Sequence, residues 1–234
     1  MSYTEQSVGD ADKRAAADAA VAEIADGMLV GLGTGSTAAF AIAAIGRRVQ
    51  QGLRLRAVAT SLASAEQARG LGVEVLDFAD VAAVDLTIDG ADEIDEAMLV
   101  VKGAGGAMLR EKCVAAASDR MVVIADGAKR VGRIGAARVP VEALPFARAY
   151  VARVLAERSD AALRMAGAEP YRTDGGNFVL DCAFADLSDP HGVAAWLQAI
   201  PGVLGHGLFL SEVDGAYLAM DGVVTRLERS DLSL

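Results

Sequence analysis

The sequence lacks the features that mark several common classes of protein. No apolar run reaches membrane-spanning length, so we expect a soluble chain that does not bind membranes. The first residues, MSYTEQSVGDADKR, lack the basic and then apolar layout of a secretory signal. The formal net charge is −10, and such an acidic chain is a poor partner for nucleic acid.

Cysteine and histidine are scarce, with two of each in the chain. Cys113 and Cys182 lie in apolar stretches, which is typical of free thiols in a reducing cytoplasm, where we expect the protein. His191 and His206 lie far apart in the sequence, and we expect both to be structural. Neither a Ser-His or Cys-His pair nor a zinc-ligand spacing is present. The sequence therefore predicts no metal and no cofactor.

Short apolar strands alternate with helices over the first half of the chain. The pattern predicts helices at 10–25, 37–50 and 62–69, and strands at 28–32, 53–59, 73–76, 84–88, 98–101 and 121–125. This alternation is typical of an α/β fold with a doubly wound parallel sheet.

The pattern changes after Lys129. Strands at 138–141, 161–166, 177–183 and 203–210, with helices at 146–158 and 189–199, give the order βαββαβ of small ferredoxin-like domains. A hairpin at 216–227 follows. We expect a catalytic domain at 1–133, to which 211–234 returns, and a smaller lid and oligomerisation domain at 134–210.

The most informative stretch is DLTIDGADEIDEAMLVVKGAGGAMLREK, residues 85–112. One apolar run ends at Asp89 and Asp92, a second leads into Lys102 and a glycine-rich turn, and a helical stretch carries Glu111. Open α/β sheets bind their ligands at such strand ends. Carboxylates beside a lysine are suited to moving protons next to a negative charge.

The acidic residues of this stretch have more than one interpretation. Asp89 and Asp92 carry the oxygen ligands that a divalent cation prefers, or they form a solvated turn. The positive charge of Lys102 lessens the need for a metal. We expect Glu93, Asp95 and Glu96 to lie at the surface.

Glu111 has no basic neighbour at helical spacing. The residues three and four positions away are Ala107, Met108, Val114 and Ala115. A carboxylate on such an apolar strip is partly desolvated, which raises its pKa toward the range of a general base. The alternative is membership of a buried ion pair. Arg110 and Lys112 are expected to serve structure or solubility.

The loop GLGTGST, residues 31–37, lies between a predicted strand and a predicted helix. Backbone N–H groups and hydroxyls at a helix start form an anion site. A dinucleotide loop is the rival, but the next strand ends in Ala59-Thr60-Ser61 without the acid that holds a ribose. We therefore favour a phosphate or sugar ligand, with an unliganded tight turn as the alternative.

Together these motifs resemble ribose-5-phosphate isomerase of the A type. The matching pieces follow the family's order and cover nearly the whole chain: Gly31 to Thr37, Asp89 to Glu93, Lys102-Gly103, Arg110 to Lys112, Ala125-Asp126 with Lys129, Pro140 to Glu142 with Pro145, and Ile200 to Val203. The resemblance implies a Rossmann-like domain with a ferredoxin-like lid, assembled as a homodimer or homotetramer.

The resemblance also implies an activity, the interconversion of ribose 5-phosphate and ribulose 5-phosphate in the pentose phosphate pathway. It implies that Glu111 is the base, that Asp89 and Asp92 open the ring and hold hydroxyls, and that Lys102 stabilises charge. The implied substrate-binding residues are Lys13, Thr34, Gly35, Ser36, Thr37, Asp89, Gly90, Ala91, Asp92, Lys102, Gly103, Ala104, Gly105 and Lys129.

The chain departs from the family pattern at three positions, where Ala104 replaces a glycine, Leu109 a threonine and Ala128 a serine. Only Ala104 bears on the site, since its methyl group narrows the turn if the backbone there needs glycine-only angles.

Two other functions remain as alternatives. An amino-sugar-phosphate isomerase or deaminase is expected to recruit a histidine near the sugar, and the first 130 residues contain none. A non-catalytic phosphosugar-sensing domain would accompany a DNA-binding module. Only residues 1–27 precede the first predicted strand, and the acidic charge opposes DNA binding.

Overall fold

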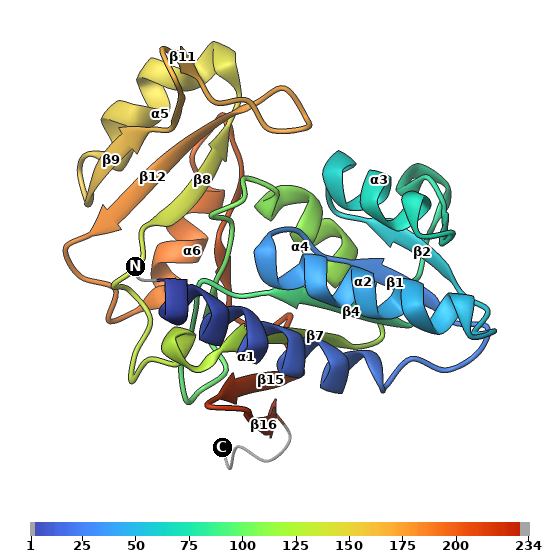
Figure 1. The fold of residues 1–234 in the computed structure, drawn as a ribbon. Helices are drawn as coiled ribbons and strands as arrows, with labels where there is room; N and C mark the ends of the chain where they lie inside the picture. The colour runs from blue at the N-terminus through green and yellow to red at the C-terminus, as the bar shows by residue number, and fades with distance from the viewer. Residues whose placement is uncertain (1–2, 230–234) are drawn as a thin grey trace.

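A seven-stranded sheet with the order β16-β15-β7-β4-β1-β2-β3 forms the centre of the computed structural model, which describes residues 3–229 (Figure 1). Its strands are β1 (Leu29–Leu32), β2 (Arg56–Ala59), β3 (Glu74–Val75), β4 (Leu86–Gly90), β7 (Met121–Asp126), β15 (Gly215–Met220) and β16 (Val223–Glu228). All neighbours pair in parallel except β15 and β16, the predicted hairpin at one edge.

Both faces of this sheet are covered. The helices α1 (Tyr3–Val21), α2 (Ser36–Gln50) and α3 (Leu62–Gly70) contribute to one apolar core with Val122 and Ile124 of β7. Their neighbours Val123 and Ala125 point to the other face, as strand geometry requires, and join a second core. There the sheet is covered by α4 (Met108–Ala116) and a small sheet of β5 (Glu93–Ile94), β6 (Val100–Val101) and β14 (Leu208–Phe209). The predicted Rossmann-like α/β fold is confirmed.

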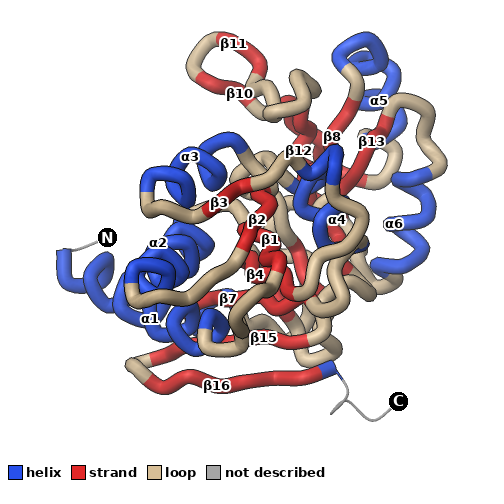
Figure 2. The backbone as a smooth tube through the Cα atoms, turned by 90° about the vertical axis from the view of Figure 1, so that its right-hand side faces the viewer, coloured by secondary structure: helices blue, strands red, loops and turns tan. Residues whose placement is uncertain are grey.

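A four-stranded antiparallel sheet with the order β13-β8-β12-β9 lies beside the main sheet. Its strands are β8 (Val139–Ala143), β9 (Ser159–Leu163), β12 (Phe178–Phe184) and β13 (Val203–His206), packed against α5 (Arg148–Leu155) and α6 (Pro190–Gln198). We call these elements the smaller unit. It has the predicted order βαββαβ, and Figure 2 shows its short β10 (Met165–Ala166) and β11 (Glu169–Pro170) pair projecting from it. Three 3₁₀ turns complete the fold: η1 (Phe78–Asp80), η2 (Gly127–Lys129) and η3 (Pro145–Ala147).

The predicted strand 203–210 is in fact two strands that belong to different sheets. The two strands meet at Gly207. Its N–H donates to the carbonyl of Pro140, and its carbonyl accepts from the amide of Lys102. A Cβ atom on Gly207 would lie 2.1 Å from the carbonyl oxygen of Lys102. Glycine is therefore required for the chain to cross so close to Lys102. The domain boundaries at 134 and 210 stay a prediction.

Glu93 and Asp95 are buried, so the prediction that they lie at the surface is wrong; only Glu96 is exposed. The Glu93 carboxylate accepts hydrogen bonds from the amides of Gly135 (2.7 Å) and Ala137 (2.6 Å). It thereby fixes the segment that leads from the main sheet into β8. This role depends on contacts more than forty residues away in sequence, which a local pattern cannot reveal.

The cysteines also differ from one another. Both are free thiols, but Cys113 is exposed on α4 whereas Cys182 is buried in β12. The prediction of free thiols is confirmed for both.

Within residues 3–229, no helix combines the length and the apolar character needed to cross a membrane.

Candidate active site

A cavity of about 510 Å³ opens over the carboxyl ends of the central strands β1, β4 and β7. The chain leaves β1 toward one edge of the sheet and β4 toward the other, so the cavity lies at the switch point where open α/β sheets bind ligands. Its walls come from loops after all three strands, from the turn before α4, and from Lys13 of α1.

The structure brings the predicted site residues together. Every residue that we expected to bind substrate lines this cavity except Asp89, whose side chain lies fully buried against Lys102. Glu111 also lines the cavity, as do two residues outside our prediction, Asp126 and Ala128. Asp126 ends β7, so the rule that led to Asp89 at the end of β4 would also have found it.

The first two glycines of the 31–37 loop make room for β4. A Cβ atom on Gly31 would lie 2.0 Å from Oγ1 of Thr87, and one on Gly33 would lie 2.0 Å from Oδ1 of Asp89. Strand β1 and the residue after it can therefore lie this close to β4 only without side chains at these two positions. The glycine pattern that resembles a dinucleotide loop has this packing explanation.

The same loop presents the start of α2 to the cavity. The N-cap residue Gly35 provides no side-chain cap, so the first N–H groups of the helix stay available for an anion. Ser36 and Thr37 add hydroxyl groups on the cavity wall. Lys13 lies on the same wall, with its ammonium group 3.6 Å from Asp10.

Thr60 and Ser61, which end the next strand where a dinucleotide site would have an acid, do not line the cavity. Thr60 is buried, and its Oγ1 lies 2.7 Å from Oγ1 of Thr34. Ser61 caps α3 through the amide of Ser64. Thr60 therefore supports the loop, whereas Ser61 stabilises the start of α3.

Three buried charges lie beneath the cavity. The ammonium nitrogen of Lys102 lies 3.0 Å from Oδ2 of Asp89 and 3.3 Å from Oε2 of Glu111, and it donates to the carbonyl of Gly90 at 2.5 Å. These side chains are at most 3% exposed. The other oxygen of Asp89, Oδ1, accepts from the amides of Thr34 (3.0 Å) and Gly90 (2.7 Å).

Two carboxylate oxygens in this cluster are poorly satisfied. Within the described chain, Oδ2 of Asp89 and Oε2 of Glu111 accept no well-formed hydrogen bond, and each is paired instead with the charge of Lys102. A buried carboxylate oxygen that lacks a donor binds a proton readily. The geometry thus leaves one proton acceptor on each side of the lysine.

The electrostatics of the cluster favour proton transfer near neutral pH. Burial, and then the negative charge of Asp89, raise the pKa of Glu111 to about 8. Burial also raises the pKa of Asp89, against the opposing charge of Lys102. Burial acts to lower the pKa of Lys102, but the charges of Asp89 and Glu111 outweigh it and raise that pKa. Lys102 therefore stays charged over the pH range in which Glu111 titrates.

The turn after Lys102 completes the cavity wall. Gly103 has φ 106°, and a Cβ atom there would lie 2.9 Å from Cβ of Met108. Ala104 is not among the residues with positive φ, so its methyl group is compatible with the turn. Its amide donates to Oδ2 of Asp92 at 2.9 Å, which fixes that carboxylate at the cavity wall.

The charged neighbours of Glu111 lie away from the cavity, as the sequence predicts. Arg110 lies 3.6 Å from Asp174 of the smaller unit. Lys112 pairs with Glu212 at 2.6 Å and lies over the ring of Phe209, 4.0 Å from its centroid.

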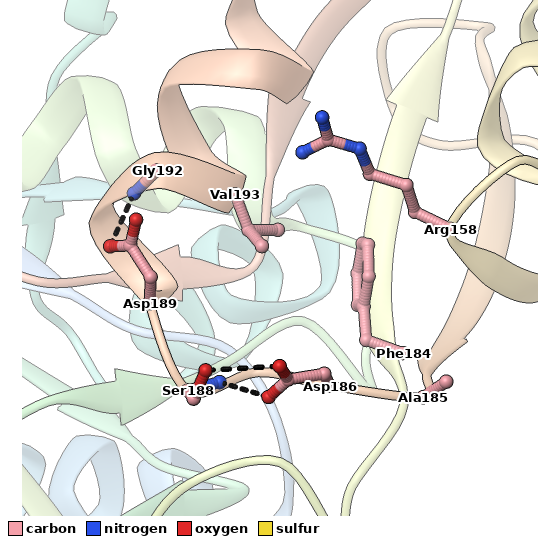
Figure 3. A pocket seen from close by; sticks show the side chains of 8 residues that line it. All are labelled: Arg158, Phe184, Ala185, Asp186, Ser188, Asp189, Gly192 and Val193. Carbon is pink, nitrogen blue, oxygen red and sulfur yellow. Dashed lines mark hydrogen bonds between the residues drawn. The ribbon is translucent and has the colours of Figure 1, made fainter.

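A second hollow, drawn in Figure 3, lies in the smaller unit between Arg158, Phe184 and the start of α6. Its two carboxylates already accept hydrogen bonds from neighbouring residues. Asp186 accepts from the amide and the hydroxyl of Ser188, and Asp189 accepts from the amide of Gly192. It contains none of the predicted site residues. Among residues 3–229, no group of three or more histidine, cysteine or acidic side chains is arranged to hold a metal.

A buried carboxylate and ammonium beneath a cavity that has a helix start on its wall are typical of α/β enzymes that move protons on a small anionic substrate. Comparison with known proteins makes the assignment specific. The family model for ribose 5-phosphate isomerase A (phosphoriboisomerase A) matches residues 56–222. The chain belongs to this family and is an isomerase.

The relatives match over nearly their full length. Ribose-5-phosphate isomerase A of Sphingopyxis alaskensis is 48% identical over 94% of this chain and 97% of its own. The protein of the same name from Parvibaculum lavamentivorans is 44% identical over 91% of this chain and 95% of its own. The solved ribose 5-phosphate isomerase A of Methanocaldococcus jannaschii has a TM-score of 0.88 at 32% identity, and the match covers 92% of this chain and 97% of that one. A D-ribose-5-phosphate isomerase solved with phospho-erythronic acid has a TM-score of 0.90 at 32% identity, and the match covers 98% of this chain and 100% of that one.

Proposed function

We propose that this chain interconverts ribose 5-phosphate and ribulose 5-phosphate in the non-oxidative pentose phosphate pathway, with Glu111 as the base. The observation that carries the proposal is the buried cluster of Asp89, Lys102 and Glu111 at the floor of a cavity whose wall includes the start of α2. The names of the relatives support the substrate, and phospho-erythronic acid, which one of them binds, combines a phosphate with a charged sugar acid.

The sugar is held at two ends in this proposal. Its phosphate lies at the start of α2, where the Thr34–Thr37 loop supplies amides and hydroxyls and Lys13 supplies charge. Lys129, which lines the cavity beyond β7, also contacts the substrate. Asp89 lies below the cavity surface beside Lys102, so the proposal requires the anomeric end of the sugar to enter as far as its carboxyl group, which exchanges a proton with the ring oxygen and the anomeric hydroxyl and opens the furanose. Asp92 holds a hydroxyl of the open chain.

Isomerisation then moves one proton between adjacent carbons. Glu111 removes the proton from C2 of the aldose, and the electron pair of that bond moves to the C1 carbonyl to give an enediolate. Lys102 offsets the negative charge that grows on the oxygen, a contribution that is large in a water-poor site. The hydroxyl proton of the intermediate passes from O2 to O1, the electron pair on O2 closes the C2 carbonyl, and Glu111 returns its proton to C1. One carboxylate serves both steps because the two carbons are neighbours.

The first test is turnover itself. The purified chain, treated with EDTA, is expected to convert ribose 5-phosphate to ribulose 5-phosphate, because a charged lysine takes the place that a metal would fill. Loss of activity that Mg²⁺ or Mn²⁺ restores would contradict the metal-free mechanism. Binding without any turnover would instead favour the phosphosugar-sensing alternative, and turnover of an amino-sugar phosphate alone would favour the deaminase.

Thr37→Val is expected to raise KM for ribose 5-phosphate more than it lowers kcat. The substitution removes a hydroxyl at the start of α2 and keeps the shape of the side chain. Phosphate contacts are remote from the reacting carbons, although part of their binding energy is also available in the transition state. Steady-state kinetics check this, with Thr225→Val on the exposed edge strand β16 as a control. An unchanged KM would place the phosphate elsewhere.

kcat/KM is expected to fall as the pH drops below about 8, because the active form of Glu111 is the carboxylate and its pKa is raised to about 8. We call this decrease the acid limb of the profile. Its midpoint is an apparent pKa of the interacting groups Asp89, Lys102 and Glu111 together. Asp89→Asn removes a negative charge that raises this pKa, so the limb should move to lower pH even though the rate falls. A limb that stays in place or moves to higher pH would show that Asp89 does not tune the base.

Assembly and location remain proposals of the same kind. We infer a homodimer or homotetramer in the cytoplasm, and exposed apolar side chains of the smaller unit, such as Phe146 (99% exposed) and Tyr150, support a contact surface between subunits.

A further inference from the structure

Three successive carbonyl groups of the glycine-rich turn are bound by two side chains of the smaller unit. Nη1 of Arg164 donates to the carbonyl oxygens of Gly103 (3.2 Å) and Ala104 (3.0 Å). The hydroxyl of Tyr171 donates to the carbonyl of Gly105 at 3.1 Å. Neither side chain lines the cavity of the active site. Both contact the turn through its carbonyl groups.

Arg164 is itself held rigidly. Its Nε and Nη2 atoms donate to the two carboxylate oxygens of Asp181 on β12, at 2.9 and 2.5 Å. The two side chains are only 16% and 22% exposed. A bidentate pair of this kind fixes the plane of the guanidinium group, which a lysine cannot do. The third nitrogen, Nη1, is thereby aimed at the turn.

Tyr171 is part of the same assembly. Its ring centroid lies 5.6 Å from the guanidinium carbon of Arg164, and its amide donates to the carbonyl of Arg164 at 2.9 Å. Gly106 of the turn packs against it, since a Cβ atom there would lie 2.4 Å from the tyrosine oxygen. Figure 1 shows the segment after β11 extending from the smaller unit toward α4 and α3, and its Asp174 accepts from the amide of Leu62 at 2.7 Å.

The direction of these bonds decides which groups face the substrate. In a trans peptide the carbonyl and the following N–H point in opposite directions. With the carbonyls of Gly103 and Ala104 turned toward Arg164, the amides of Ala104 and Gly105, two residues that line the cavity, point away from Arg164. The first amide binds Asp92, and the second makes no hydrogen bond within the described part of the chain. It is available to an oxygen of the substrate.

We propose that Arg164, oriented by Asp181, and Tyr171 are positioning residues that hold the turn after Lys102 in its productive conformation. They act through the turn. The orientation of its peptide planes fixes the direction of the Gly105 amide and the position of the Asp92 carboxylate, and the turn begins directly after Lys102. The inference rests on the proposed isomerase function, because its effect is on that reaction.

The test compares Arg164→Met with Arg138→Met. Arg138 is a matched control, because it also binds two carbonyls, those of Asp160 and Asp181, and pairs with a carboxylate, but it makes no hydrogen bond to the turn. Arg164→Met is expected to lower kcat on the order of 10–100-fold with KM changed less than about threefold, since small misplacements of reacting groups cost about that much. Arg138→Met should leave kcat at the wild-type value.

Two further variants separate positioning from folding. Arg164→Lys keeps the charge and one donor, so it should recover part of the lost kcat. Tyr171→Phe removes a single oxygen, is expected to fold normally, and should lower kcat about 3- to 10-fold with KM nearly unchanged. Wild-type kcat in both Tyr171→Phe and the folded fraction of Arg164→Met would overturn the inference. A wild-type chain that does not isomerise ribose 5-phosphate would instead overturn the proposed function on which it rests.

Discussion

Glu111→Gln is expected to lose kcat by a factor on the order of 10²–10⁴ or more, the usual effect of removing a general base. Glutamine keeps the shape of the side chain but cannot accept the proton from C2. Binding of a non-reactive phosphosugar acid should survive, because Lys102 and the Thr34–Thr37 loop are unchanged. The measurements are kcat, a calorimetric Kd and exchange of the C2 hydrogen with deuterated solvent.

The same variant carries a prediction for stability. The pKa of Glu111 is raised in the folded state, from about 4.5 to about 8, so the carboxylate is destabilised by folding. For such a group the stabilising contribution is present in full below pH 4.5 and is lost as the pH rises toward 8. Glu111→Gln is neutral at every pH. Its melting temperature should therefore exceed that of the wild type at pH 8, with a smaller difference near pH 5.

Glu142→Gln is the control, because Glu142 is as buried as Glu111 but has a different environment. Its Oε1 accepts from Thr173 (2.8 Å) and Asn177 (2.9 Å) in the smaller unit. Its amide variant should lose stability while the folded enzyme keeps its kcat. A stable, ligand-binding Glu111→Gln that exchanges the C2 hydrogen at the wild-type rate would refute the assignment of Glu111 as the base.

The part of the site that could be predicted from the sequence is the part that depends on local pattern. Asp89 and Lys102 stand at the ends of apolar runs, and Glu111 lacks a basic partner at helical spacing. These properties depend on neighbours in the chain. Asp89 ends a parallel strand of the main sheet, where such folds bind ligands, so the sequence indicated its place. Lys102 instead follows β6, which pairs antiparallel with β5 and β14, so its approach to Asp89 depends on the small sheet.

The rest depends on contacts between distant segments. Nothing near Glu93 in the sequence shows that its carboxylate binds amides at Gly135 and Ala137. Nothing near Gly207 shows that the chain changes sheets beside Lys102. Lys13 has the local pattern of any lysine on an amphipathic helix, and only the family resemblance singled it out.

Lys102→Met is expected to lower kcat by at least about 10³, because two effects add. The variant loses the charge that offsets the enediolate, and one such donor is worth about 10²–10³ in rate. It also removes the positive charge that lowers the pKa of Glu111. The base then carries a proton at neutral pH, so less of the enzyme is in its active form.

The same change should destabilise the fold in a pH-dependent way. Asp89 and Glu111 are buried and lose their shared counter-charge, and breaking a buried ion pair costs about 3–5 kcal/mol. Both carboxyl groups escape this cost by taking up protons, so the loss should be large at pH 8 and smaller near pH 5. Chemical denaturation at the two pH values measures it.

A double variant separates the two effects of Lys102. Asp89→Asn with Lys102→Met removes one carboxylate as well, so it should recover much of the stability at pH 8 without recovering kcat. Lys112→Met is the control, since its ammonium lies over the same Phe209 ring but pairs with Glu212 outside the cavity. It should lose some stability and keep kcat within about tenfold, because its charge lies farther from the reacting carbons. If Lys102→Met also kept kcat within tenfold, the lysine would be a structural counter-ion, and the charge of the enediolate would have to be stabilised by the amides of the turn.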